Sequence, residues 1–506
     1  MSMGQSDLRR DARVGMRAAK HIVIVGGGIA GLSAAWYLQQ EAARRDLAIH
    51  YTIAEESSRW GGKVHTERVA DFGDMPFMLE AGPDALLTYK PWAVTLAREL
   101  GLEDHLVGGN PANSRTFVLH RGRLVPLPAG LQLLVPTKVW PFVRSPLFSW
   151  RGKLRVALET RIPPRRDAAD ESLADFVRRR FGREALETLA EPLMADVYNV
   201  SSSHQSILAT FPQYPALEAR YGSVIRGSLA ATRQRQTARS ATPSPPFVSL
   251  DGGTQSLVDA LLSKLTGDLR LRSAVDQVLR TADDSYQVVL ADGSRLDADT
   301  VILATPARVS ASLLAGTAPS ASSLLGEIGY TSIGNAYLAF WRQDVSHPLD
   351  GYGVVIPRAE GRHIDGMSWT SSKWLGRAPD DYVLLRVFFG GPHTRDLLSL
   401  DDVALLAVVR AEVAALLGVR ESPVFQRVYR WPDGYPQYEV GHLAHVDAIE
   451  AALPAGIYVT GSAYRGIGIP DCVRQGQEAA GQAVRALMAT PAPRLASIAE
   501  PPQVGR

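Results

Sequence analysis

The chain has 506 residues, 46% hydrophobic and 21% charged, which is typical of globular proteins with two or three packed domains. Its 54 Lys and Arg residues nearly balance its 52 Asp and Glu residues, so no nucleic-acid partner is expected. The single cysteine, Cys472, excludes an internal disulfide and favours a reducing, cytoplasmic location, so redox chemistry would need a bound cofactor.

The first apolar segment, Ile22 to Leu38, has three interpretations: a signal-peptide core, a membrane span or a nucleotide-binding turn. The segment before it carries Asp7 and Asp11, and the glycines at 26–28 would weaken a membrane helix. We therefore expect no signal peptide and no transmembrane segment there. The residue pattern instead predicts a βαβ unit, with strands at 21–25 and 49–54, a turn at 26–31 and a helix at 32–43.

The turn of this unit carries a GxGxxG motif, Gly26, Gly28 and Gly31, in the context that gives the motif its meaning. Gly26 permits the tight turn, Gly28 lets the backbone approach a pyrophosphate, and Gly31 lets the helix pack closely on the strand. The helix N-terminus presents free N–H groups to the phosphates. Glu55, after the second strand, is placed to accept hydrogen bonds from a ribose diol. A bound dinucleotide, NAD or FAD, is predicted.

Two later parts of the chain read as further pieces of the same domain. One runs from the turn and helix at 247–265 to the buried strand that ends at Pro306, and the other is a strand, glycine turn and helix at 456–487. The sequence thus predicts an α/β fold in which a discontinuous Rossmann-like cofactor domain is interrupted by two long insertions. The expected divisions are a cofactor domain at 20–90, 245–308 and 445–488, a helical part at 91–227, a flexible linker at 228–246, a substrate-domain sheet at 309–444, and mobile ends at 1–19 and 490–506.

The choice between NAD and FAD depends on the residues after Glu55, which include Arg59 and the pair Gly61 and Gly62. This text resembles the second signature of the FAD-dependent amine oxidase and phytoene desaturase superfamily, E-x-x-x-R-x-G-G, and favours non-covalent FAD. Near the C-terminus, YRGIGIPDCVRQG offers Gly466 and Gly468 for close approach to a flavin ring. The helix that follows would direct its positive end at the charge that develops on the ring during reduction.

Taken with GPDALLTYKP (Gly82 to Pro91), WTSSKWLGRAPDD (Trp369 to Asp381) and YPQYEVGH (Tyr435 to His442), these segments resemble the flavin-dependent porphyrinogen oxidases of haem synthesis. The resemblance covers nearly the whole chain and implies a two-domain, amine-oxidase-like FAD fold with a helical subdomain. Ser462 stands where amine oxidases usually carry an acid, which counts against an amine substrate. With Arg59 from the signature, the cofactor contacts that it implies are Gly26, Gly27, Gly28, Ile29, Ala30, Gly31, Glu55, Gly62, Lys63, Gly82, Pro83, Asp84, Ala85, the backbone of Val275, Ser462, Ile467, Gly468 and Ile469.

The family implies oxidation of a porphyrinogen to a porphyrin, with hydride loss to flavin N5 and reoxidation of the flavin by molecular oxygen, which releases hydrogen peroxide. The text from Val125 to Arg155 looks like the cytosolic bacterial branch that acts on coproporphyrinogen III. Protoporphyrinogen IX is the close alternative. The number of cationic groups around the pocket would distinguish the two substrates, because coproporphyrinogen III has four propionates and protoporphyrinogen IX has two. An amine oxidase or desaturase, and a non-catalytic carrier of FAD and a porphyrin, are further alternatives.

Few other side chains point to a chemical role. Arg115 falls near where the family places a basic residue that pairs with a propionate, although a solvated surface arginine is an equal interpretation. The eleven histidines show no metal-ligand spacing, so no metal site is predicted. Arg178 to Arg180 are expected on an exposed helix face, and Leu131 to Phe148 could form a pocket wall or a surface in peripheral contact with a membrane. Nothing in the sequence predicts an oligomeric state.

Overall fold

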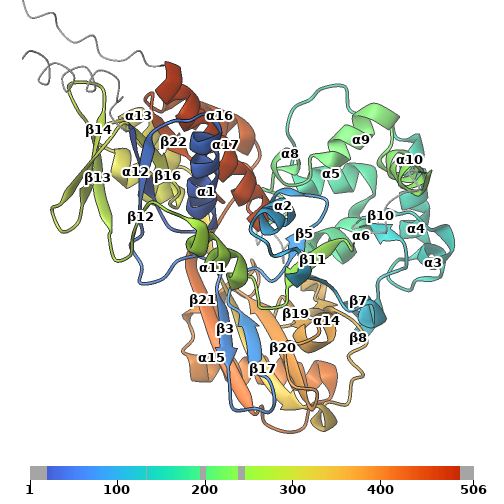
Figure 1. The fold of residues 1–506 in the computed structure, drawn as a ribbon. Coiled ribbons are helices and arrows are strands. Elements are labelled where there is room, and N and C mark those ends of the chain that lie inside the picture. Colours follow the sequence, from blue (N-terminus) through green and yellow to red (C-terminus); the bar gives the residue numbers. More distant parts are fainter. Residues whose placement is uncertain (1–19, 133, 194–200, 238–244, 490–506) are drawn as a thin grey trace, which may run out of the picture.

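The computed structural model describes residues 20–132, 134–193, 201–237 and 245–489. The elements lie in three groups: a parallel sheet with helices packed on it, a large antiparallel sheet, and a group of helices to one side (Figure 1). The expected mobile ends, 1–19 and 490–506, lie outside the described residues.

The parallel sheet has five strands in the order β12-β2-β1-β16-β22. Its central strand β1 alternates between two cores, as expected for a sheet that is covered on both faces. Ile22 and Ile24 pack with helices α1 and α17, whereas Val23 and Val25 pack with α12, α13 and the small sheet β13-β14-β15. The elements of this group are β1 (Lys20–Val25), α1 (Ile29–Arg44), β2 (Ile49–Ala54), α2 (Trp92–Glu99), α11 (Gln255–Lys264), β12 (Asp268–Arg270), β13 (Val275–Arg280), β14 (Tyr286–Leu290), β15 (Arg295–Ala298), β16 (Thr300–Leu303), α12 (Ala307–Leu314), α13 (Pro319–Gly326), α16 (His442–Ala452), β22 (Ile457–Val459) and α17 (Ile469–Ala489).

The second sheet has seven strands in the order β21-β17-β20-β19-β18-β7-β8, antiparallel except for the pair β18 and β7. Along β17, Leu338 packs with helix α15 on one face, while Tyr337 and Ala339 pack with β4 on the other. Its elements are β7 (Thr116–His120), β8 (Arg123–Pro126), β17 (Tyr330–Trp341), η6 (Arg342–Asp344), β18 (Gly353–Val355), η7 (Arg358–Glu360), β19 (Gly366–Trp369), α14 (Thr370–Lys373), β20 (Tyr382–Phe389), η8 (Arg395–Ser399), α15 (Asp402–Leu417) and β21 (Phe425–Pro436).

Short strands connect the two sheets, and the helical group has its own apolar core, built around Phe176, Phe181 and Leu186. The connecting elements are β3 (Thr66–Val69), β4 (Phe77–Glu80), β5 (Leu86–Leu87), η2 (Glu103–His105), β6 (Leu106–Gly108), η3 (Pro111–Asn113) and β11 (Phe247–Leu250). The helical group consists of β9 (Leu131–Gln132), β10 (Val135–Pro136), α3 (Val139–Arg144), α4 (Trp150–Ala157), η4 (Leu158–Arg161), α5 (Leu173–Arg180), α6 (Arg183–Ala185), η5 (Leu186–Ala190), α8 (Ile207–Thr210), α9 (Gln213–Tyr221) and α10 (Val224–Thr237).

Several expected boundaries differ from the structure. The expected helical part, 91–227, begins with α2, which packs in the core of the parallel sheet, and with β7 and β8, which join the large sheet. The expected substrate-domain sheet, 309–444, begins with residues of α12 and α13, because their apolar faces cover the parallel sheet. The expected linker at 228–246 is helical as far as Thr237, since its Ala, Arg and Gln residues favour helix; residues 238–244 lie outside the described residues.

Arg180 is also not on an exposed helix face. Its guanidinium is fully buried and forms ion pairs with Glu159 and Glu218. Arg178 is exposed, as expected, and pairs with Asp175.

Candidate flavin site

The phosphate turn joins β1 to α1. Gly26 has a φ angle of 106° and donates its N–H to the carbonyl of Ala54 at 2.8 Å, which ties the end of β1 to the end of β2. A Cβ atom on Gly31 would lie 2.0 Å from the carbonyl oxygen of Gly26, so only glycine fits there. A Cβ on Gly28 would meet only Gly62 Cα, at 4.0 Å. The space in front of the helix N-terminus is thus open for a pyrophosphate.

A second glycine turn lies against the first. Gly61 donates its N–H to the carbonyl of Gly27 at 2.9 Å, and Gly62 adopts a left-handed φ of 59°. The Arg59 guanidinium donates to the carbonyls of Gly62 and Val64. In this structure Arg59 therefore stabilises the second turn, and the two turns together make the cradle.

The Glu55 carboxylate lies beside the phosphate turn. One oxygen accepts a hydrogen bond from Gly27 N at 2.6 Å and the other from Ser57 N at 2.9 Å. A carboxylate has about four acceptor positions, so two remain for a ribose diol. Ser273 N donates to the carbonyl of Glu55 at 2.8 Å, so the chain that leads into β13 runs alongside Glu55. This brings Val275, two residues later, to the same end of the site.

The C-terminal glycine turn meets the first turn of α1. A Cβ on Gly461 would lie 3.8 Å from Ala30 Cβ, and a Cβ on Gly476 would lie 2.6 Å from the carbonyl oxygen of Ala30. Ala30 and its neighbour Ile29 are buried at this junction. The end of β22, with Ser462 just beyond it, and helix α17 therefore pack directly on the phosphate turn.

Tyr438 fixes the loop between β22 and α17. Its hydroxyl donates to the carbonyl of Ser462 and accepts from Gly466 N, both at 2.8 Å. Its ring stacks on His442, with centroids 4.0 Å apart. His442 bonds the carbonyl of Tyr464 at 2.7 Å through Nε2, and burial lowers the pKa of His442 to about 4, so this histidine is neutral at pH 7. Sequence reasoning did not find Tyr438, which it saw only as part of YPQYEVGH.

The same loop approaches the N-terminus of α17, which begins at Ile469. A Cβ on Gly466 would lie 2.4 Å from Asp471 Cγ, and one on Gly468 would lie 3.3 Å from an Asp471 oxygen. Asp471 forms an ion pair with Lys90 at 2.7 Å. Between the two glycines, Ile467 packs against the core of the helical group. The loop thus lies where the parallel sheet and the helical group meet.

The segment from Gly82 to Ala85 is held from the opposite side. A Cβ on Gly82 would lie 1.9 Å from the Lys63 carbonyl oxygen, and Arg386 Nη2 donates to the Gly82 carbonyl at 2.6 Å. The Pro83 carbonyl accepts from the Thr254 hydroxyl at 3.2 Å.

Asp84 is an ion-pair partner of Lys373, at 2.8 Å, and also accepts from the indole of Trp374 at 3.1 Å. Although burial acts to raise it, the pKa of Asp84 is held well below its usual range by the Lys373 ammonium and the Arg386 guanidinium. Asp84 is therefore ionised at any pH at which the protein would be assayed. Lys373 and Arg386 are further residues that sequence reasoning missed.

Lys63 provides a test of whether the site suits FAD. Its ammonium forms no hydrogen bond or ion pair with the residues that the structure describes, and burial lowers its pKa. A half-buried cation without a counter-ion is stabilised by an anion, and the pyrophosphate and the reduced ring of a flavin dinucleotide are both anionic. The open space at Gly28 and this cation therefore both fit FAD.

Arg115 is not brought together with the cofactor residues. Its side chain is 64% exposed and pairs with Asp350 at 2.7 Å, and the residue directly precedes β7. Binding of a propionate by Arg115 stays a prediction.

Comparisons with known proteins agree with this geometry. The flavin containing amine oxidoreductase family matches residues 29–484. The chain is 34% identical to a coproporphyrinogen III oxidase of Bacillus subtilis over 92% of this chain and 98% of that protein, and 29% identical to the chloroplastic protoporphyrinogen oxidase of Oryza sativa over 93% and 89%. A crystal structure from Exiguobacterium, assigned as a protoporphyrinogen oxidase, superimposes with a TM-score of 0.79 at 30% identity and covers 94% of this chain and all of that one.

These matches confirm the predicted fold class and the predicted resemblance. They also confirm the cofactor, since the family contains a flavin and the glycine cradle has the form of a dinucleotide site. The chain is therefore an FAD-dependent oxidoreductase and belongs to the flavin containing amine oxidoreductase family, in which its relatives include the porphyrinogen oxidases.

Proposed function

We propose that this protein oxidises coproporphyrinogen III to coproporphyrin III, with molecular oxygen as the final electron acceptor. The relatives named coproporphyrinogen III oxidase support this substrate, because they are 32–34% identical over nearly their whole length, whereas the plant protoporphyrinogen oxidases are 28–29% identical. Protoporphyrinogen IX is the alternative substrate.

One observation carries the assignment of the substrate position. Ile467, in the loop beside the N-terminus of α17, packs against the helical group, and so does Tyr435 at the end of β21. A macrocycle next to this loop would therefore be enclosed by helices on one side and by the large sheet on the other. Enclosure of this kind orients the substrate and excludes water, which hydride transfer requires.

We further propose that FAD is held by the residues that the family resemblance implies. The two glycine turns and Glu55 would bind the pyrophosphate and ribose, and the loop at 466–469 would lie against the ring system. Bound FAD would supply the hydride acceptor, and molecular oxygen would take up the electrons as hydrogen peroxide. The positive end of α17 and the Lys63 ammonium would stabilise negative charge in this region.

The substrate's propionates require cations, and Arg115 is the proposed partner of one of them. Since Arg115 already pairs with Asp350, a propionate would replace that carboxylate at the guanidinium, a bidentate arrangement that arginine favours.

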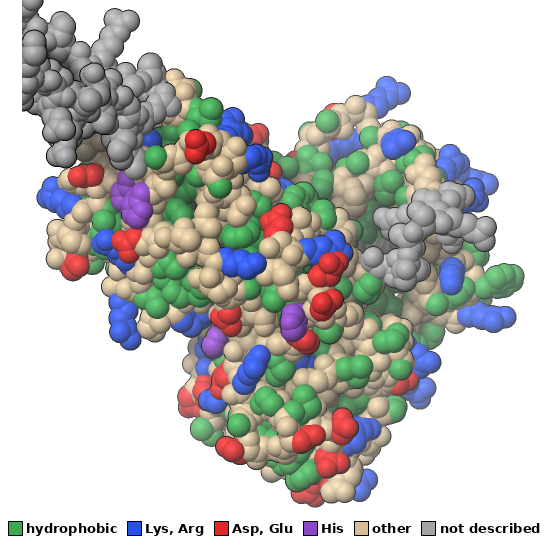
Figure 2. Space-filling view, viewed as in Figure 1, with side chains coloured by type: hydrophobic (Ala, Val, Ile, Leu, Met, Phe, Trp, Pro, Cys, Tyr) green, Lys and Arg blue, Asp and Glu red, His purple; other side chains and the backbone are tan. Residues whose placement is uncertain are grey.

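A membrane surface is the second proposed partner. The described residues include no helix long and apolar enough to cross a bilayer. On α3 and α4, however, Trp140 and Trp150 are 71% and 73% exposed, and Arg144 and Lys153 lie over their rings. Apolar side chains project at the edge of the molecule where these helices lie (Figure 2). Exposed tryptophans beside cations suit peripheral contact with anionic lipid from the cytoplasmic side.

The test of the substrate is a comparison of kcat/KM for the two porphyrinogens under air, with porphyrin fluorescence and peroxide as readouts. We expect a higher value for coproporphyrinogen III. A higher value for protoporphyrinogen IX would reverse the substrate assignment. Consumption of an amine or a carotene precursor, with neither porphyrinogen oxidised, would favour the amine oxidase or desaturase alternative, and FAD binding without turnover would favour a carrier.

A further inference from the structure

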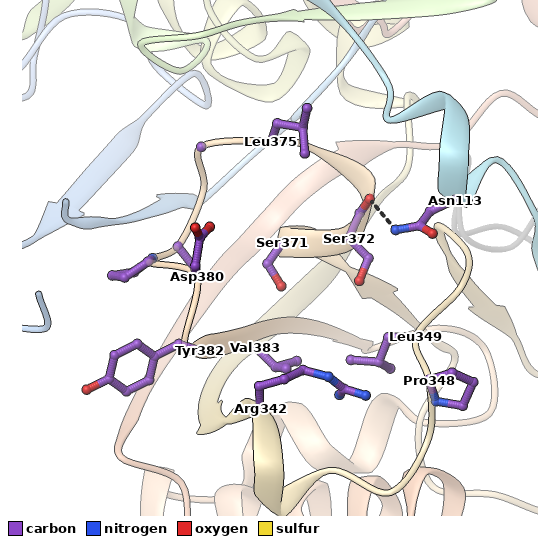
Figure 3. A pocket seen from close by; sticks show the side chains of 13 residues that line it. Asn113, Arg342, Pro348, Leu349, Ser371, Ser372, Leu375, Asp380, Tyr382 and Val383 are labelled. Atoms are coloured by element: carbon purple, nitrogen blue, oxygen red, sulfur yellow. Dashed lines mark hydrogen bonds between the residues drawn. The ribbon is translucent and has the colours of Figure 1, made fainter. Parts of the chain in front are cut away.

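A cavity of about 190 Å³ lies in the large-sheet part of the molecule, away from the glycine turns. It is bounded by η6, by α14 with the loop that follows it, and by the start of β20 (Figure 3). Since a water molecule occupies about 30 Å³ in the liquid, the space corresponds to about six waters, or to a small ligand with two or three of them.

Arg342 contributes the charge of this cavity. Its Nη2 donates to the carbonyl of His347 at 2.8 Å, but its Nη1 is buried and has no hydrogen-bond partner among the residues that the structure describes. The guanidinium forms no ion pair with any described carboxylate either. A buried, charged donor without an acceptor is costly, so an acceptor at this position would stabilise the protein.

Two hydroxyl groups share the cavity with this nitrogen. Ser371 Oγ accepts a hydrogen bond from Leu384 N at 3.0 Å, which leaves its own O–H free to donate. Ser372 is bound through its carbonyl, which accepts from Asn113 Nδ2 at 3.4 Å, and its hydroxyl makes no hydrogen bond within the described residues. Figure 3 shows both serine side chains directed toward the side of the cavity on which Arg342 lies.

The lining also includes one carboxylate, that of Asp380. It is exposed, and in Figure 3 it points away from Arg342. Asn113 and Tyr382 add further polar groups to the lining, whereas Pro348, Leu349 and Val383 are apolar. The side of the cavity with Arg342 thus presents hydrogen-bond donors and a positive charge. The apolar lining residues favour a short carbon skeleton or a compact ion.

We propose that this cavity is a binding site for a small oxyanion, a phosphate or a carboxylate, held by Arg342 Nη1 and the hydroxyls of Ser371 and Ser372. The site is separate from the proposed oxidation reaction and does not depend on it. Ser371 and Ser372 belong to α14, and the last residue of this helix, Lys373, donates a hydrogen bond to Asp84 in the flavin site. An anion bound to Ser371 and Ser372 would therefore stabilise the helix that holds the Gly82–Ala85 segment.

Binding can be tested on the FAD-loaded protein by calorimetric titration with sodium phosphate and with sodium acetate, at an ionic strength held constant with chloride. We expect saturable binding of at least one oxyanion, and the stronger of the two identifies the class. In Arg342→Gln, affinity should fall at least about tenfold, the effect of losing a charged hydrogen bond. Arg420→Gln, which removes an exposed arginine from the same part of the molecule, should bind as the unchanged protein does.

A second variant and a second measurement protect the test against misfolding. Ser372→Ala removes a hydroxyl that bonds no described residue, so it should fold normally and bind the oxyanion several-fold more weakly. Hydrogen exchange at the amides of residues 370–376 should slow when the oxyanion is added. Absence of saturable binding of either oxyanion, equal affinity in Arg342→Gln, or protection confined to other segments would overturn the proposal.

Discussion

Removal of one hydroxyl group, by Tyr438→Phe, should weaken FAD binding as well as destabilise the fold. The ring and its stacking on His442 are retained, but the hydrogen bonds to Ser462 O and from Gly466 N, each 2.8 Å long, are both lost. The buried N–H of Gly466 is left without a partner, which costs about 1–3 kcal/mol, and loss of the Ser462 bond adds about 1 kcal/mol. The expected destabilisation is about 2–4 kcal/mol.

Because the lost bonds hold the loop beside α17, part of this free energy should appear as reduced FAD affinity. The loop would sample positions that do not fit the cofactor, and a cost of about 1.4 kcal/mol would raise the FAD dissociation constant about tenfold. Urea unfolding of the FAD-free protein measures stability, and fluorescence titration of flavin measures affinity.

Tyr286→Phe is the matched control. Tyr286 is also buried and donates its hydroxyl to a single carbonyl, that of Ala455, in the sheet core behind the site. This variant should lose stability while its FAD affinity stays unchanged. Equal FAD affinity in Tyr438→Phe and the unchanged protein would refute the positioning role of Tyr438.

Three further predictions follow from other contacts. Gly31→Ala places a Cβ atom 2.0 Å from the carbonyl oxygen of Gly26, so it should displace α1 and lower the free energy of unfolding by about 1–3 kcal/mol. The variant should purify without yellow colour, and a stable, fully flavin-loaded variant would contradict the assignment of this turn to the pyrophosphate. Asp84→Asn should lower the free energy of unfolding by about 3 kcal/mol near pH 7, because it leaves Lys373 unpaired. Since the folded-state pKa of Asp84 is depressed, this loss of stability should be complete above about pH 5 and shrink as the pH falls through about 3.9. A loss that does not change with pH in urea unfolding would argue against this role of Asp84. The double variant Trp140→Ser, Trp150→Ser should lose sedimentation with vesicles of phosphatidylserine and phosphatidylcholine, whereas the exposed-residue control Leu375→Ser should retain it, and equal sedimentation of all three proteins would dismiss the membrane surface.

The sequence predicted the parts of the site that depend on local backbone geometry. GxGxxG after a β-branched run and E-x-x-x-R-x-G-G each lie within one short segment, and in each motif one glycine is required by a contact close in the chain, Gly31 with Gly26 and Gly61 with Val64. Propensity and spacing are sufficient to identify such elements.

Residues that act across the fold were not predictable in the same way. Tyr438, Lys373 and Arg386 reach the site from the large sheet and its connections, between 24 and 304 residues away from the groups that they bind. Arg180 illustrates the same limit: within the run of three arginines it looks solvent-facing, but its burial depends on Glu159 and Glu218, which come from other helices. A single sequence carries no signal for such pairings, because the register of packing sets them.

The most direct test of the account is an anaerobic single-turnover experiment on the purified, yellow protein. Mixing with one equivalent of coproporphyrinogen III should bleach the flavin absorbance in a single rapid phase, and admission of air should restore it with formation of hydrogen peroxide. If the flavin stays oxidised with coproporphyrinogen III and with protoporphyrinogen IX, although it is reduced by dithionite, the protein is not a porphyrinogen oxidase.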